Sequence, residues 1–140
     1  MKAMVDQTAG FEELEHTADW ALRIWAPSLA GLLEQAARGM YDLSGTVVKS
    51  GGQETHTFTV ESNDAEGLLV GFLGELLHYV DEEGLVFDEF DLAVAEHVVK
   101  ARVTGAKIVE RKKEIKAVTF HNLKIEEKDG LLEAQIVFDV

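Results

Sequence analysis

Cysteine is absent from all 140 residues of the sequence. This excludes disulfides, cysteine-ligated zinc, iron–sulfur clusters and thiol catalysis, and it is typical of a protein in a reducing cytosol. No apolar run approaches the roughly 20 residues of a membrane-spanning helix. The first ten residues also lack the apolar stretch of a signal peptide. We therefore expect a cytoplasmic protein with no membrane partner.

Basic residues are few relative to acidic ones, and the formal net charge is -13 at pH 7. A free-standing nucleic-acid binder needs a basic face, so we expect no stable direct binding to nucleic acid. An acidic protein is suited to meet a basic partner or a cation. Acidic side chains crowd residues 81–91, and basic ones crowd residues 100–116. We interpret both runs as solvated, with docking of phosphate or an acidic partner surface as the alternative for the basic run.

Hydrophobic periodicity predicts two long helices. Ser28 is expected to cap the first, which ends at Gly45. Asn63 and Glu66 are expected to form a capping box at the start of the second, which ends at Gly84.

The remaining apolar stretches alternate as strands do. Residues 106–114 read as a charged loop, and a change of phase at His121-Asn122 predicts a β-bulge. Asp129-Gly130 is expected to form the turn of a C-terminal hairpin. Strands are expected at residues 20–26, 47–48, 55–60, 85–94, 98–105 and along much of 118–140.

The order strand, helix, strands, helix, strands predicts an α+β fold with a mainly antiparallel sheet and two main helices packed on it. A strand followed by a helix occurs twice, from Trp20 and from Thr55, so a strand–helix–strand–strand duplication is a hypothesis. We assign residues 1–10 to a flexible N-terminal tail and residues 11–140 to a single domain.

Two hypotheses concern the polar residues 15–19, which directly precede the first long strand. In the first, Asp139 and the α-carboxylate of Val140 hold a cation, and Asp19 completes the set if the two strands are neighbours. Oxygen ligands favour a hard ion such as Ca²⁺ or Mg²⁺. The alternative is that Asp139 is a solvated terminal residue.

The second hypothesis is acid–base catalysis by His16 and Asp19 with Thr17, in a small phosphoester hydrolase. No serine or cysteine nucleophile lies in a recognisable elbow, and no phosphate-binding loop of the Walker type is present. Spacing alone does not decide among this chemistry, the cation site and a cluster that simply caps a turn.

Four motifs resemble those of the archease family, in the same order and with similar spacing over residues 11–140. They are His16-Thr17-Ala18-Asp19, the long second helix with the following Gly84-Leu85-Val86-Phe87, the stretch 115–121 and the ending Phe138-Asp139-Val140.

The resemblance implies a protein cofactor and not an enzyme. Archeases assist the GTP-dependent RNA ligase that joins tRNA halves, promoting its guanylylation and multiple turnover. An older proposal for the family is a chaperone for a tRNA methyltransferase. The resemblance also implies a bound divalent ion, Ca²⁺ with Mg²⁺ or Mn²⁺ as alternatives, on ligands that match Asp19, Asp139 and Val140.

Other signature positions match His16, Lys116 and His121, for which we expect support of the site or contact with the partner. Glu15 stands where the family often has aspartate, and it keeps the charge with a longer reach.

Overall fold

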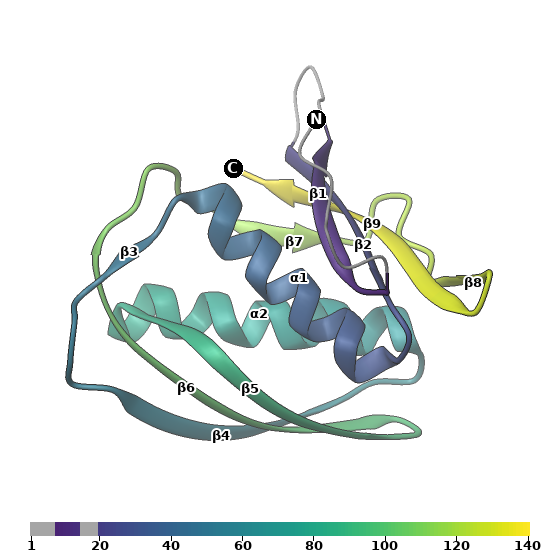
Figure 1. Ribbon diagram of the computed structural model, residues 1–140, viewed down its shortest axis with the longest axis horizontal. Helices are drawn as coiled ribbons and strands as arrows, with labels where there is room; N and C mark the ends of the chain where they lie inside the picture. Colours follow the sequence, from purple (N-terminus) through teal and green to yellow (C-terminus); the bar gives the residue numbers. More distant parts are fainter. Residues whose placement is uncertain (1–7, 15–19) are drawn as a thin grey trace.

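The computed structural model describes residues 8–14 and 20–140 and shows an α+β fold (Figure 1). The predicted fold class is confirmed, because the described residues form two helices and mainly antiparallel strands. Within these residues, neither helix is long and apolar enough to cross a membrane. The elements are β1 (Gly10–Leu14), β2 (Trp20–Ala26), α1 (Leu29–Ser44), β3 (Val47–Val48), β4 (Glu54–Glu61), α2 (Ala65–Glu83), β5 (Leu85–Ala95), β6 (Val98–Glu110), β7 (Ala117–Thr119), β8 (Glu126–Lys128) and β9 (Leu131–Asp139).

The strands divide into two sheets, and both helices contact strands of each sheet (Figure 1). The first sheet has the order β1-β2-β9-β7, with β8 pairing with β9 as well. The second has the order β3-β6-β4, with β5 also paired with β6. The hypothesis of an internal duplication stays a prediction.

The core lies between the two sheets and is continuous from one to the other. Alternate residues of β2 and β9, among them Ile24 and Phe138, are fully buried on the side that meets the helices. Phe72 of α2 is fully buried in the same cluster and packs near Phe58 of β4, with 6.0 Å between ring centroids. Burial of each such side chain contributes about 1.5–3 kcal/mol to folding, so this core holds the strand ends described below in place.

The helix ends follow local signals, with one correction. Ser28 caps α1, as predicted, and its hydroxyl accepts a hydrogen bond from the Gly31 N–H. The capping box predicted for α2 is wrong. Asp64, not Asn63, is the cap, and its carboxylate accepts from the Gly67 N–H at 2.7 Å. The reason is that the helix begins at residue 65, so Asp64 stands three residues before the free N–H. The Glu66 carboxylate does not reach back, because it accepts from the Ile125 N–H.

This cap can be tested with two adjacent substitutions. Asp64→Ala is expected to lower the free energy of unfolding by about 1 kcal/mol, because an N–H in the first turn of α2 loses its acceptor. Asn63→Ala is the matched control and is expected to change stability by less than about 0.5 kcal/mol. Urea denaturation measures both, and an equal loss for the two variants would contradict the assignment.

Two strand boundaries also differ from the sequence prediction. Residues 106–110 were expected in a charged loop, but β6 continues to Glu110, pairing with β5 through Lys107 and with β3 at Ile108 and Glu110. Backbone pairing with strands on both sides outweighs the low β-propensity of the charged side chains. At the N-terminus, Gly10 belongs to β1, where it lies opposite Trp25, and not to the expected tail.

The β-bulge predicted at His121-Asn122 is wrong. β7 ends at Thr119, and β7 and β8 pair with different parts of β9. Between them the chain turns, with Asn122 in the left-handed region at φ 55° and the Leu123 N–H donating to the Phe120 carbonyl. The change of phase therefore comes from an interruption of the strand and not from an extra residue within it.

Candidate functional site

The start of β2 and the end of β9 lie side by side in the first sheet. The antiparallel register places Trp20 opposite Phe138, and Ala117 of β7 lies opposite Asp139 on the other side. The Lys116 N–H donates to the Asp139 carbonyl at 2.8 Å, which continues the ladder by one residue. The cation hypothesis required these two strands to be neighbours, and the register meets that condition.

The register also decides which face of the sheet Asp139 occupies. Ala21 lies opposite Val137. Because side chains alternate along a strand, Ala21, Val137 and Asp139 share one face. Asp139 is exposed, and its carboxylate forms no ion pair or hydrogen bond with any residue of 8–14 or 20–140. A free carboxylate at a strand end fits a hard cation in charge and donor type.

Three of the predicted site residues, Glu15, His16 and Asp19, lie outside the described residues. Val140 is half-buried and its side chain packs against the core, which fixes the end of the chain beside Asp139. The structure thus brings Asp139, Val140 and Lys116 together at one end of the sheet.

His121 lies elsewhere. It follows Thr119, which faces Val137, so it lies beyond the end of β7 that is away from Asp139. Its backbone N–H donates to the Thr119 hydroxyl, and its exposed ring is 3.2 Å from the Asn122 amide. The preceding Phe120 has 60% of its surface exposed. An exposed aromatic residue next to an exposed histidine suits contact with a protein partner. Sequence reasoning placed His121 in this role but did not single out Phe120.

Part of the basic run also reaches this end of the sheet. The Lys113 ammonium lies over the Trp20 ring, 5.2 Å from its centroid. Lys116 contacts the same strand end through its backbone N–H, which donates to the Asp139 carbonyl. The run is therefore not only a solvated face, because one of its members contacts the first residue of β2.

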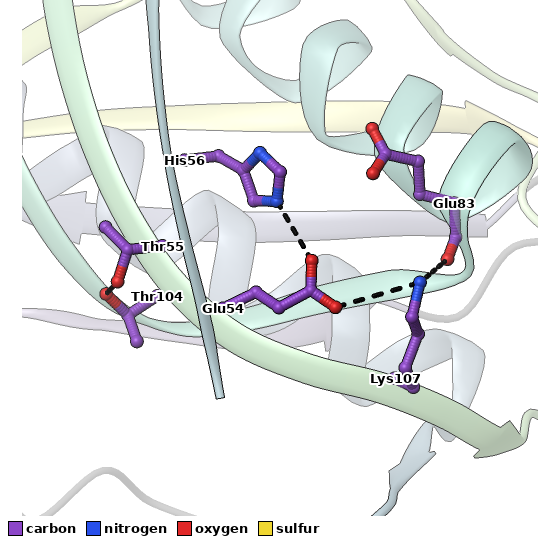
Figure 2. Close-up of polar contacts among 6 residues, drawn as sticks. All are labelled: Glu54, Thr55, His56, Glu83, Thr104 and Lys107. Atoms are coloured by element: carbon purple, nitrogen blue, oxygen red, sulfur yellow. Dashed lines mark hydrogen bonds and ion pairs between the residues drawn. The ribbon is translucent and has the colours of Figure 1, made fainter. Parts of the chain in front are cut away.

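A second polar cluster, which sequence reasoning missed, lies at the other sheet (Figure 2). His56 Nε2 is 3.3 Å from Glu54 Oε1, and Lys107 Nζ is 3.8 Å from Glu54 Oε2. Lys107 also donates to the Glu83 carbonyl at 2.9 Å. Sequence reasoning interpreted His56 as a structural histidine on the face of Phe58, and its ring is indeed half-buried and partnered. The only available signal was the Glu54-Thr55-His56 alternation on one strand.

Comparison with known proteins gives a consistent result over nearly the whole chain. The family model described as Archease protein family (MTH1598/TM1083) matches residues 11–140. The protein archease of Pyrococcus abyssi (strain GE5 / Orsay) is 38% identical over 139 residues, covering 93% of this chain and 98% of that protein.

Two solved structures have a fold similar to that of this chain. The crystal structure of an archease from Thermotoga maritima, described as a possible chaperone, has a TM-score of 0.70 at 27% identity and covers 92% of this chain and 96% of that chain. The solution structure of Methanobacterium thermoautotrophicum protein 1598 has a TM-score of 0.72 at 29% identity, covering 94% and 99%.

Proposed function

The chain belongs to the archease family, and from this premise we propose that it is a metal-binding accessory protein that activates an RNA ligase. In this role it promotes guanylylation of the ligase and multiple turnover in tRNA splicing or repair. The isolated chain is proposed to have no catalytic activity of its own, and the cytoplasm is its proposed location.

One observation carries the metal-binding half of the proposal, namely the register that sets Trp20 opposite Phe138. In this arrangement Asp139 and the terminal carboxylate of Val140 would hold the ion, and Asp19, one residue before β2, would complete the set. The ion would supply positive charge between carboxylates that otherwise repel one another. Oxygen donors favour Ca²⁺, with Mg²⁺ or Mn²⁺ as alternatives.

The proposed binding of the ligase rests on two exposed parts of the first sheet. One is the end that carries Asp139, and the other is the turn after β7. Lys116, Phe120 and His121 are all exposed there. We propose that they contact the ligase, with Phe120 as the apolar anchor, because exposed aromatic side chains supply much of the energy of protein interfaces. His16 and Glu15 are proposed to support the ion or the same contact.

The second candidate is a chaperone for a tRNA-modifying enzyme such as a methyltransferase. It is favoured by the exposed valines at the outer end of the second sheet, Val47, Val48 and Val109, because exposed apolar side chains can hold a partly folded client. The Thermotoga maritima relative is itself described as a possible chaperone.

Multiple-turnover ligation tests the proposal, using an RNA ligase from the same source with and without this protein. We expect the wild-type chain to raise the rate of guanylylation and ligation about tenfold, which lies within the roughly 5–150-fold range of coupling between two binding sites. Asp139→Asn should lose most of this stimulation. Asp91→Asn removes an exposed carboxylate of β5, in the other sheet, and should keep it.

Two outcomes would overturn the proposal. The first is a ligase rate that the wild-type chain leaves unchanged while it suppresses aggregation of a methyltransferase, which would favour the chaperone. The second is steady hydrolysis of nucleotides or phosphoesters by the pure protein that His16→Ala abolishes, which would establish an enzyme.

A further inference from the structure

Three potential metal ligands lie together where the C-terminal end of α2 meets β4 of the second sheet. The proposed calcium site belongs to the first sheet. Glu54 and His56 stand two residues apart on β4, so their side chains share the face that meets the helix. Glu83 is the last residue of α2. One ligand atom from each of the three lies within 4.8 Å of the others, around a common space with Lys107 at its edge (Figure 2).

The distance between the two ligands on β4 suits a shared ion better than a strong hydrogen bond. His56 Nε2 and Glu54 Oε1 are 3.3 Å apart, whereas charge-assisted hydrogen bonds between such groups are about 2.7–2.9 Å long. Two ligands at the bond lengths found for zinc, on a tetrahedral ion, are about 3.3 Å apart. An ion could therefore enter between these atoms with little movement of either side chain.

The His56 ring is also held in place before any ion binds. It packs against Tyr79, with centroids 5.0 Å apart, and against Phe87 at 6.0 Å. Only about a quarter of its side chain, 27%, is exposed. A ring fixed in this way loses little conformational entropy on binding, which favours affinity.

Negative charge is concentrated in the last turn of α2, which borders this space. The last turn of α2 carries Asp81, Glu82 and Glu83, at the end of the helix where the backbone dipole is already negative. Burial, and then the nearby carboxylates of Glu75 and Glu83, raise the pKa of the Tyr79 hydroxyl. Lys107 offsets part of this charge through Glu54 and the Glu83 carbonyl. A divalent cation would offset more of it.

We propose that Glu54, His56 and Glu83 form a second cation site, selective for a borderline ion of the Zn²⁺ class. The imidazole nitrogen separates this site from the proposed calcium site, whose donors are all oxygen, because nitrogen ligands suit Zn²⁺ and not Ca²⁺. Glu83 is exposed, so a further position on the ion is open to water. The bound ion would tie the end of α2 to β4. The site is independent of the proposed action on RNA ligase.

Zinc titration of the full chain tests this site, by calorimetry in excess calcium so that the oxygen site is filled. The imidazole ¹⁵N signals of the five histidines are followed in parallel. We expect one zinc ion per chain and a shift of the His56 Nε2 signal. His56→Asn and Glu83→Gln should each weaken zinc binding about tenfold or more. His97→Asn is the control, because His97 is exposed in the turn between β5 and β6, at the opposite end of the sheet.

Lys107→Met provides an independent check that does not remove a ligand. The substitution removes the ammonium that competes for Glu54, so it should raise the zinc affinity several-fold. Weak or absent zinc binding by the wild-type chain would overturn the proposal and leave a hydrogen-bonded contact between β4 and α2. Unchanged zinc binding by His56→Asn, or an unshifted His56 signal, would overturn it equally.

Discussion

Replacing Asp139 by asparagine is expected to remove most of the stabilisation that we propose calcium gives this protein. A cation at 100 times its dissociation constant stabilises the folded state by about 2.7 kcal/mol, which for a domain of this size corresponds to roughly 8 °C in Tm. Asparagine keeps the shape of the side chain but removes the charge that attracts the ion. Without calcium, Asp139→Asn should leave the stability of the folded state equal or slightly higher. The reason is that the substitution removes the repulsion between the Asp139 carboxylate and the terminal carboxylate of Val140.

Thermal unfolding with calcium and with a chelator measures both effects. Asp91→Asn is the control and should show the full calcium shift. A chain extended by one residue after Val140 converts the α-carboxylate into an amide, so its calcium shift should be smaller than that of the wild-type chain. A calcium-induced rise in Tm that is equal in the wild-type chain, Asp139→Asn, Asp91→Asn and the extended chain would contradict a site at the end of β9.

Gly105→Ala is expected to destabilise the fold more than a methyl group added to any other glycine between residues 31 and 130. A Cβ there would run into the backbone carbonyl oxygen of Val86 and lie 2.5 Å from the Cα of Phe87, and neither backbone atom can rotate away. Gly105 is buried opposite Phe87, next to the register shift in the pairing of β5 with β6. Separating the two strands should cost about 3 kcal/mol or more.

Gly74→Ala is the matched control, with the opposite expected sign. Gly74 lies on the exposed side of α2, and apart from the adjacent residues and backbone of α2 itself no atom lies within 4 Å of where its Cβ would stand. Alanine is the better helix former, so this substitution should stabilise the fold by up to about 1 kcal/mol. Urea denaturation measures the free energy of unfolding of both variants. If Gly105→Ala lowers it by no more than about 1 kcal/mol, β5 and β6 can separate with little loss of stability, which would contradict this prediction.

Features with a local cause could be read from the sequence. Ser28 caps α1, Gly45 and Gly84 end the two helices in the left-handed conformation, and Asp129-Gly130 makes the hairpin turn with positive φ at both residues. Each depends on only a few neighbouring residues. The cap of α2 shows the limit of such reasoning, because two adjacent residues can cap and the position of the first helical turn decides between them.

Features that depend on distant pairing could not be read in the same way. The course of β6 beyond Gly105 depends on β3 and β5, which are supplied by other parts of the chain. The break between β7 and β8 likewise depends on β9, because these two short strands pair with different parts of it. Charged residues and a change of phase were visible in the sequence, but their partners were not.

The candidate sites also combine features that the sequence shows locally with features that depend on distant pairing or packing. The sequence predicts Asp139 as a ligand by its residue type and its place at the end of a strand. That β2 starts beside it follows only from the register of two strands separated by more than a hundred residues. The cluster of Glu54, His56 and Glu83 has no motif spacing, because its third member arrives at the end of α2 and becomes a neighbour only through packing.

Calcium titration of Asp19→Asn beside the wild-type chain and Asp139→Asn tests most directly whether β2 and β9 share one ion. We expect the wild-type chain to bind one calcium ion at this end of the sheet. Either substitution alone should weaken that binding about tenfold or more, because each removes one anionic ligand of the same ion. Wild-type calcium affinity in Asp19→Asn, with binding lost only in Asp139→Asn, would contradict a site shared between the two strands.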